Sequence, residues 1–327
     1  MIITKTPFRM SFLGGGTDVP EFFKEYGGAV ISTTLDKYCY VNVRRLPPFF
    51  HYKNQVTYSK IERVNAVGEI EHPMVREAMK YLDMRDLIIT YDADLPARTG
   101  LGTSSSFAVG LLQAFYALKG ELISKKQLAD EAIFLERKLC QEAGGLQDQI
   151  AASFGGFNRI DFTTAGYSVS PIPISAQRKE QLNRCLMLFF SGFSRVSTDI
   201  QNDTKNHIRD KIKQLLEIKS FVNQGQKILT NEKINLDEFG KLLDYTWRIK
   251  RQIGSKITTS YIDQIYAKAL SAGALGGKLL GAGGGGFLLF YVPVEKQKRV
   301  RRALSELLLV PFKFETVGTE IIYQTVE

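Results

Sequence analysis

The sequence predicts an α+β protein with two domains, and three observations support this prediction. The chain has 327 residues, which is long enough for a large core and for more than one domain. Segments with the pattern of strands are mixed with segments of helical pattern along the chain. Residues 157–176 contain strands, turns and two prolines, Pro171 and Pro173, and they are the best candidate for a linker. We therefore expect one domain at residues 1–168 and another at residues 169–327.

The composition is that of an ordinary globular protein, and the net charge favours anionic partners. Hydrophobic residues make up 44% of the chain and charged residues 24%. The formal charge of +9 suits nucleotides, sugar phosphates, nucleic acid or an acidic membrane surface. No apolar run approaches the roughly 18 residues of a membrane span. Cys39, Cys140 and Cys185 are too far apart for a disulfide framework or a metal cluster, so buried thiols in a reducing cytoplasm are the simplest explanation.

The first element is a strand that ends in a glycine turn. Residues 2–12 have an alternating pattern, and a Gly-Gly-Gly-Thr-Asp run follows at 14–18. Arg9 precedes this turn and Asp18 ends it, so a cation and a carboxylate flank the flexible backbone. An exposed charge on the strand and a helix N-cap would explain the same two residues. Further strands are expected at residues 29–35, 38–45 and 87–91, and a short helix is expected at 72–82.

The strongest motif lies between a strand and a helix in the first half of the chain. Residues 95–106 contain Gly100 and Gly102, which are followed at once by hydroxyl residues and then by an apolar run at 107–118 that predicts a buried helix. Glycines let the backbone approach an anion closely, and the free N–H groups and the positive end of the helix dipole would face it. The segment therefore predicts a phosphate-binding loop, although a glycine turn with a serine N-cap contains the same residues.

Two carboxylates follow this loop at positions that suggest chemistry. A helix is expected from Ser124, because Ser124 and Gln127 have capping-box spacing and apolar residues then recur at intervals of three and four. Glu136 falls at the edge of that apolar face, where its side chain can reach solvent or point into a cleft. Asp148 lies on a short helical segment between glycine pairs, where an unpartnered carboxylate is costly. A first-turn position at a helix start is the alternative explanation for Asp148.

The second half is expected to contain a buried strand, several helices and a third glycine-rich segment. Gly281, Gly283 and Gly286 fit the pattern G-x-G-x-x-G. A dinucleotide site requires a helix after this pattern, whereas here a strand at residues 287–292 follows, so we reject that interpretation. The buried strand is expected at 184–190, helices at 198–223, 235–253, 259–272 and about 294–308, and the last strands near 311–315 and 320–325.

Three glycine-rich segments, in this order and at these intervals, resemble the GHMP kinase superfamily. They cover residues 7–18, 96–106 and 278–286 and together span nearly the whole chain. The first has the form Arg-x-Ser-Phe-x-Gly-Gly-Gly-Thr-Asp, which is similar to the branch that contains heptose 7-phosphate kinases and L-fucokinases. Within that branch, residues 98–107 are most similar to the heptose kinases. Gly15 stands where galactokinases carry a glutamate that contacts the sugar, which argues against galactose as the substrate.

The resemblance implies a two-domain GHMP kinase fold with the active site between the domains. The N-terminal, ATP-binding domain would be ribosomal S5-like and the C-terminal domain ferredoxin-like. Asp148 matches the catalytic acid that accepts or orients the hydroxyl proton, and Arg9 matches a cation near the transferred phosphate. Glu136 matches the family's Mg²⁺ carboxylate, and Ser104 would lie near the metal. The residues implied to bind ATP are Pro96, Arg98, Thr99, Gly100, Leu101, Gly102, Thr103, Ser104 and Ser105.

The resemblance also implies a substrate site that is rich in glycine. A phosphorylated sugar needs cations of its own, and Arg98, Arg195 and Lys278 are the candidates. Arg195 lies in residues 191–197, where a strand end with glycine and hydroxyl residues leads into a helix and favours an anion; a surface arginine is the alternative. The substrate-binding residues that we expect are Gly14, Gly15, Gly16, Thr17, Asp18, Arg195, Lys278, Gly283 and Gly284.

The activity implied is that of a cytoplasmic sugar 1-kinase that depends on ATP and Mg²⁺. The expected substrate is D-glycero-D-manno-heptose 7-phosphate, whose anomeric hydroxyl would be phosphorylated to the 1,7-bisphosphate for nucleotide-activated heptose. An L-fucokinase-like enzyme acting on an unphosphorylated sugar is the close alternative. A nucleic-acid-binding protein with an S5-like fold is the alternative of another class, but it leaves Asp148 and Glu136 without a role. We expect a small-molecule sugar phosphate as partner, no nucleic acid and no membrane, and a homodimer stays open.

Overall fold

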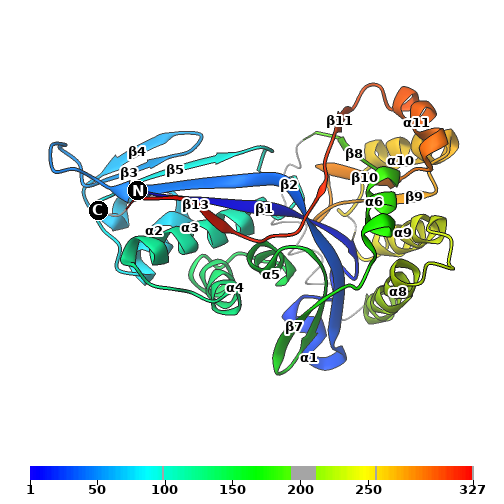
Figure 1. Cartoon of the computed structure of the whole chain (residues 1–327), viewed down its shortest axis with the longest axis horizontal. Coiled ribbons are helices and arrows are strands. Elements are labelled where there is room, and N and C mark those ends of the chain that lie inside the picture. The colour runs from blue at the N-terminus through cyan, green and yellow to red at the C-terminus, as the bar shows by residue number, and fades with distance from the viewer. Residues whose placement is uncertain (98, 193–210, 255, 326–327) are drawn as a thin grey trace.

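Two β-sheets form the framework of the molecule. The computed structural model describes residues 1–97, 99–192, 211–254 and 256–325, and within these ranges the strands form one sheet of nine strands and one of four. Figure 1 shows the larger sheet on the left and the smaller sheet on the right, each with helices packed against it. This mixture of helices and strands agrees with the predicted α+β class.

The larger sheet is built around one long strand. β2 (Gly28–Arg45) pairs antiparallel with β1 (Ile2–Leu13) over most of its length. The first half of β2 also pairs with β6 (Phe157–Thr163), and its second half pairs with β5 (Leu87–Ala93). The two strands predicted at 29–35 and 38–45 are therefore one, because β1 pairs with both halves, with a shift in register between Pro7 and Arg9. The remaining strands on this side are β3 (Asn54–Thr57), β4 (Ile61–Val64) and β7 (Gly166–Pro171).

A buried helix joins the predicted phosphate loop to this sheet. α3 (Thr103–Lys119) packs on β1 and β2. Gly110 makes the close approach possible, because a Cβ atom there would lie 2.7 Å from the hydroxyl oxygen of Thr6. The hydroxyl of Thr4 also donates to the Gly110 carbonyl at 3.0 Å. The start of α3 is thereby fixed against the strand that carries Arg9.

The remaining helices of this half place the two predicted carboxylates. α4 (Lys125–Phe134) has the predicted cap, since the Ser124 hydroxyl oxygen accepts from the Gln127 N–H at 3.2 Å. The helix then widens into a π-helical turn at Leu135–Leu139, a feature that is frequent at functional sites. α1 (Pro20–Tyr26), α2 (Pro73–Tyr81), a 3₁₀ turn at Val67–Glu69 and α5 (Gln147–Phe154) complete the set.

The smaller sheet is antiparallel and buried. Its strands follow the order β11 (Leu308–Val310), β8 (Leu186–Phe190), β10 (Phe287–Tyr291) and β9 (Gly276–Leu279). The predicted buried strand is confirmed as β8, which is paired on both sides. The helices around this sheet are α6 (Ala176–Cys185), α8 (Ile212–Thr230), α9 (Asp237–Lys250), α10 (Ser260–Ala272), a 3₁₀ turn at Val294–Lys296 and α11 (Gln297–Ala303).

The end of the chain differs from the prediction. β12 (Phe314–Glu315) pairs with β2, and β13 (Glu320–Gln324) pairs with β1, so the last residues return to the larger sheet. Figure 1 shows this return, with the two termini close together. Pairing with β13 covers the edge of β1, which would otherwise expose unpaired backbone groups. The division at 168/169 stays a prediction, but β7 spans it and the tail belongs with the first sheet.

Two further differences concern helices. The helix expected at 294–308 is shorter, because a 3₁₀ turn precedes α11 and residue 308 already begins β11. The first part of the helix expected at 198–223 lies outside the described residues, and α8 begins at Ile212. No helix in the described part of the chain is long and apolar enough to cross a membrane. The three cysteines are free thiols.

Candidate active site

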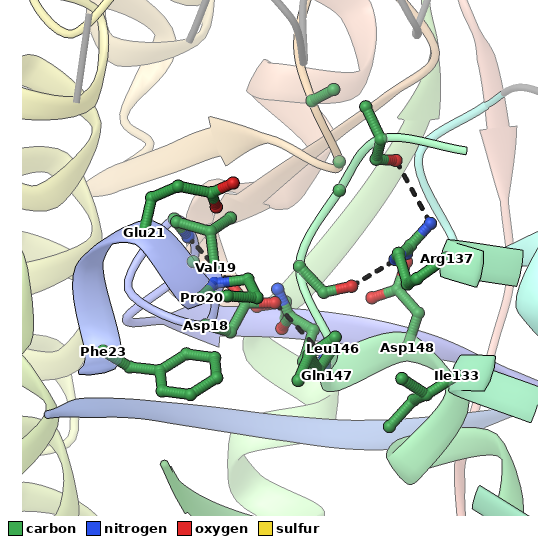
Figure 2. A pocket seen from close by; sticks show the side chains of 18 of the residues that line it. Asp18, Val19, Pro20, Glu21, Phe23, Ile133, Arg137, Leu146, Gln147 and Asp148 are labelled. Carbon is green, nitrogen blue, oxygen red and sulfur yellow. Dashed lines mark hydrogen bonds between the residues drawn. The ribbon is translucent and has the colours of Figure 1, made fainter. Parts of the chain in front are cut away.

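A cavity of about 700 Å³ lies between the two halves of the molecule. Its wall from the N-terminal half contains Arg9, Asp18 and Asp148, and its wall from the C-terminal half contains Lys250 and Lys278. Figure 2 shows part of this cavity, in which Asp18, Leu146, Gln147 and Asp148 lie together. We call these two surfaces the N wall and the C wall.

Arg9 and Asp148 form a bidentate ion pair on the N wall. The Arg9 Nε and Nη2 atoms donate to the two carboxylate oxygens of Asp148 at 2.7 and 2.8 Å, and Nη1 donates to the Gly100 carbonyl at 2.6 Å. The Arg9 side chain is 5% exposed and the Asp148 side chain 23% exposed, so the carboxylate is the member that faces the cavity. Gly102 leaves room for the pair, since a Cβ there would lie 3.1 Å from Cγ of Arg9. The structure thus joins two residues that are 139 positions apart.

Asp18 is buried next to this pair. Its carboxylate accepts from the Gly16 N–H at 3.0 Å and from the Gln147 N–H at 3.2 Å. Burial raises the pKa of Asp18, and the nearby negative charge of Asp148 adds to the rise, while the backbone hydrogen bonds oppose it. Gly145 permits the contact, because a Cβ atom there would lie 1.9 Å from an Asp18 carboxylate oxygen. The glycine turn and the start of α5 therefore form one unit.

The predicted phosphate loop packs directly against the third glycine-rich segment. A Cβ atom on Gly281 would lie 2.4 Å from Cα of Gly100, and one on Gly286 would lie 2.3 Å from the carbonyl oxygen of Thr99. The Phe287 N–H also donates to the Thr99 carbonyl at 3.1 Å. Glycine is required here because two backbones meet without room for a side chain. The two motifs, about 180 residues apart, thus form one continuous surface.

Glu136 is buried between α3 and α5. Its Oε2 atom accepts from the Ser105 hydroxyl at 3.0 Å and from the side-chain amide of Gln149. Its Oε1 atom is buried and has no hydrogen-bond partner among the described residues. Burial raises the pKa of Glu136 to about 7, although the neighbouring Arg137 guanidinium lowers it. An unpaired buried carboxylate oxygen is costly unless a cation or a proton meets it.

These groups fit a Mg²⁺ ion that also binds phosphates. Magnesium in phosphoryl-transfer sites is usually held by one or two carboxylates together with phosphates and water. Glu136 supplies one carboxylate with a free oxygen, and the Ser105 hydroxyl at the start of α3 lies beside it. Within the described ranges, no group of three or more His, Cys, Asp and Glu residues is placed to hold a metal without such help.

Arg137 holds the loop that precedes α5. Its guanidinium donates to the carbonyls of Glu142, Ala143 and Gly145 at 3.3, 3.1 and 2.8 Å. Figure 2 draws hydrogen bonds of Arg137 as dashed lines. The same guanidinium lies 3.5 Å from the Glu136 carboxylate. Arg137 thereby connects the carboxylate expected at the metal with the loop that contacts Asp18.

The C wall carries two ammonium groups that are bound to backbone carbonyls. Lys278 is 2% exposed and donates to the Ser11 and Phe12 carbonyls at 2.8 and 2.9 Å, so it crosslinks β9 to β1. Lys250, at the end of α9, is half-buried and donates to the Gly281 carbonyl at 2.9 Å. Burial lowers the pKa of Lys250 to about 8, and it lowers the pKa of Lys278 well below its usual value.

Some of the expected site residues shape the walls rather than line the cavity. A Cβ on Gly14 would lie 1.9 Å from the Ala29 carbonyl oxygen. Thr17 is buried and donates to the carbonyls of Gly14 and Ala29 at 2.8 and 2.9 Å, so both residues hold the turn. Gly283 and Gly284 pack against Ile257, whose carbonyl accepts from the Gly284 N–H at 3.0 Å.

The predicted ATP-binding residues lie around the start of α3, with one difference at the hydroxyls. Ser104 is exposed, and Ser105 is the residue whose hydroxyl reaches Glu136. The Thr99 hydroxyl donates to the Pro96 carbonyl at 2.8 Å, which tightens the loop. Arg98 and Arg195 lie outside the described residues. The roles assigned to Ser104, Arg98 and Arg195 stay predictions.

Several residues that line or support the site are not evident from the sequence pattern. Lys250 belongs to a basic run at the end of a predicted helix, and basic residues there are usually explained by the helix dipole. Its place at the cavity is therefore evident only from the fold. Arg137 follows Glu136 directly, and its contacts depend on a loop that the pattern does not predict. Ser11 has a buried hydroxyl oxygen without a partner among the described residues, and it lines the cavity. Ser11 lies two residues after Arg9, and this closeness in the sequence could have indicated that it belongs to the site.

Comparisons with known proteins agree with the geometry. Residues 66–156 match the family model of the GHMP kinases N terminal domain, and residues 229–308 match that of the GHMP kinases C terminal. A D-glycero-alpha-D-manno-heptose 7-phosphate kinase from Campylobacter jejuni is 30% identical over 320 residues, which cover 93% of this chain and 93% of that protein. A bifunctional fucokinase/GDP-fucose pyrophosphorylase from Arabidopsis thaliana is 25% identical and matches 92% of this chain but 31% of its own length.

A solved structure shows the same fold over the whole chain. The crystal structure of a D-glycero-D-manno-heptose 1-phosphate kinase from Bacteroides thetaiotaomicron superposes with a TM-score of 0.80 at 24% identity. The match covers 100% of both chains. At this identity, the likeness concerns the arrangement of the elements and not the substrate.

Proposed function

The chain belongs to the GHMP kinases and is an ATP-dependent sugar kinase, and from this premise we propose that its acceptor is D-glycero-D-manno-heptose 7-phosphate. The product would be the 1,7-bisphosphate, formed at the anomeric hydroxyl for the synthesis of nucleotide-activated heptose. The observation that carries the proposal is the similarity to a heptose 7-phosphate kinase along 93% of both chains. The cavity that joins both halves supplies a site of suitable chemistry.

The ion pair on the N wall is suited to handle the acceptor hydroxyl. Asp148 faces the cavity and retains lone pairs beyond those used by Arg9, so it can accept the proton of a bound hydroxyl. The oxygen of that hydroxyl forms a bond to the γ-phosphorus, the bond from that phosphorus to the bridging oxygen breaks, and ADP leaves. Arg9 holds the Asp148 carboxylate in place and contributes positive charge beside the transferred group.

The start of α3 is suited to the nucleotide phosphates. Its free N–H groups and the glycine loop before it form a site for anions. Glu136 and a hydroxyl at 104 or 105 would hold Mg²⁺, which would neutralise charge on the phosphates when bound. Arg137 and Gln149 would keep the Glu136 carboxylate in position.

The glycine turn supports an acceptor larger than a bare hexose. Gly15 lines the cavity, and its backbone does not require glycine, because its φ is not in the left-handed region and an added Cβ would lie at ordinary distances, 3.6 Å or more, from its neighbours. The missing side chain therefore leaves space for the substrate. Gly14 contrasts with it, since the fold itself excludes a side chain there. Asp18 lies next to this space and can accept from sugar hydroxyls.

The proposal is tested by ADP release with ATP and Mg²⁺ across a panel of acceptors. The panel contains D-glycero-D-manno-heptose 7-phosphate, mannose 6-phosphate, L-fucose, galactose and a control without sugar. We expect release with the heptose phosphate alone, and phosphorus NMR of the product should show a new anomeric phosphate. Release with L-fucose instead would overturn the proposal in favour of an acceptor without a second phosphate.

A further inference from the structure

More cations than carboxylates line the cavity, six against five. Among them, Arg9, Lys250, Lys278, Asp18 and Asp148 lie close enough to influence one another's charge. Lys278 is buried and Lys250 is half-buried, and two like charges in such poorly solvated surroundings repel each other unless an anion joins them. The site is therefore arranged to receive negative charge.

The three cations differ in how many of their donors the protein already uses. Arg9 is engaged through all three nitrogens, by Asp148 and by the Gly100 carbonyl. Lys278 makes two hydrogen bonds to carbonyls of β1. In the described part of the molecule, Lys250 makes one hydrogen bond, to Gly281, so two of its three N–H donors stay available.

Arg9 from β1 and Lys250 from α9 each contact one of the two glycine loops in a similar way. Arg9 donates to the carbonyl of Gly100, and Lys250 donates to the carbonyl of Gly281. These two glycines meet backbone to backbone, because a Cβ on Gly281 would lie 2.4 Å from Cα of Gly100. The two cations thus flank the junction of the loops, one from each wall of the cavity.

We propose that Lys250 is a catalytic residue that binds the γ-phosphoryl group of ATP during its transfer to the sugar, a role that rests on the proposed kinase activity. Arg9 approaches this group from the N wall and Lys250 from the C wall. Because α9 belongs to the C-terminal half, the contact requires both halves to be in place around the nucleotide. Transfer then occurs only when the two walls are correctly placed, which limits loss of ATP to water.

The electrostatic environment of Lys250 agrees with this role. Burial and the nearby Arg9 together lower the pKa of Lys250 to about 8, although Asp18 and Asp148 act to raise it. The pKa of Lys278 is in turn lowered by Lys250. A bound phosphoryl group would relieve the repulsion among these cations, so its binding stabilises the charged form of Lys250.

Nucleotide binding without sugar provides a test that does not depend on the identity of the acceptor. We would measure the affinities of Mg²⁺-ADP and of the Mg²⁺ complex of a non-hydrolysable β,γ-imido ATP analogue for the wild type and Lys250→Met by calorimetry. Loss of a charge-assisted contact to the γ-phosphoryl group should weaken the analogue about tenfold and leave ADP within twofold. In steady-state assays kcat should fall about 10²-fold, and Lys250→Arg should restore part of it.

A matched control lies on the same helix. Lys241 is exposed and forms an ion pair with Glu238, and Lys241→Met should change neither nucleotide affinity nor kcat. An equal loss of affinity for both nucleotides in Lys250→Met, with a lower melting temperature, would overturn the proposal in favour of a structural role at Gly281. The proposal would also be overturned if Lys250→Met bound the analogue and ADP with the same ratio of affinities as the wild type. If the heptose phosphate did not stimulate ADP release but the nucleotide affinities changed as expected, the proposed acceptor would be rejected and the role of Lys250 at the γ-phosphoryl group would stand.

Discussion

The two walls of the cavity hold their charges in different ways. On the N wall, Arg9 and Asp148 neutralise each other, and in the same half of the molecule the buried Glu136 accepts hydrogen bonds from Ser105 and Gln149. On the C wall, the hydrogen bonds of Lys250 and Lys278 within the described residues go to backbone carbonyls. An ion pair fixes the orientation of both side chains before the substrate arrives. An ammonium group that donates to a neutral carbonyl is not neutralised by it and can still attract an incoming anion. Under the proposed mechanism, the N wall would orient the reacting groups and the C wall would attract and neutralise phosphate.

Removal of the proton acceptor from the N wall should have the largest effect. Asp148→Asn keeps the size of the side chain and one acceptor for Arg9 but removes the basic oxygen. We expect kcat to fall about 10³-fold while ATP affinity stays within a few-fold. Single-turnover ADP release and nucleotide titration check this result. Turnover close to that of the wild type would remove Asp148 from the mechanism.

The second largest loss of activity is expected for Glu136→Gln, which tests whether the unpaired oxygen of Glu136 binds a cation. Glu136→Gln removes the negative charge and leaves the side chain able to meet Ser105 and Gln149. We expect activity at low Mg²⁺ to fall about 10²-fold and the Mg²⁺ concentration at half-maximal rate to rise. Arg137→Lys is a useful comparison, because it alters the clamp on Glu136 and keeps the carboxylate. An unchanged Mg²⁺ dependence in Glu136→Gln would assign the metal elsewhere.

The pH dependence should report on the C wall. Lys250 has a pKa of about 8, so its ammonium is charged below that pH and loses its charge as the pH rises. Burial and Arg9 oppose the charge on Lys250, and Asp18 and Asp148 favour it. We expect kcat/KM for ATP to fall roughly tenfold for each pH unit above about 8. In Lys250→Arg this decline should move to higher pH, because guanidinium stays charged.

The smallest effect should separate the two serines at the start of α3. Ser105 contacts Glu136 in the structure, whereas Ser104 is exposed at the same helix start. If Ser104 binds the metal, Ser104→Ala should raise the half-saturating Mg²⁺ concentration about fivefold, and Ser105→Ala should instead lower stability by about 1 kcal/mol through loss of its hydrogen bond. Mg²⁺ titrations and thermal melts of both variants distinguish these roles. The reverse pattern would assign the metal to Ser105.

Local patterns identified most of the elements and several members of the site. The apolar run predicted a helix at 107–118, and α3 begins four residues earlier, at Thr103, so that it includes the hydroxyl residues. The cap at Ser124 predicted the start of α4. Asp148 was singled out because a carboxylate among small and apolar neighbours needs a partner. That partner, Arg9, was noted for its place beside the glycine turn, and the pairing itself depends on how α5 packs against β1.

The sequence by itself determined the element types, the glycine turns and the candidate residues of the N wall, because caps, periodicity and backbone freedom act over a few residues. The tertiary structure alone decided which distant residues meet. It brings Lys250 to Gly281, joins Gly100 to Gly281 and returns β13 to the edge of β1. These contacts follow from the packing of two sheets and their helices, and no local pattern encodes a distance between segments so far apart in the chain.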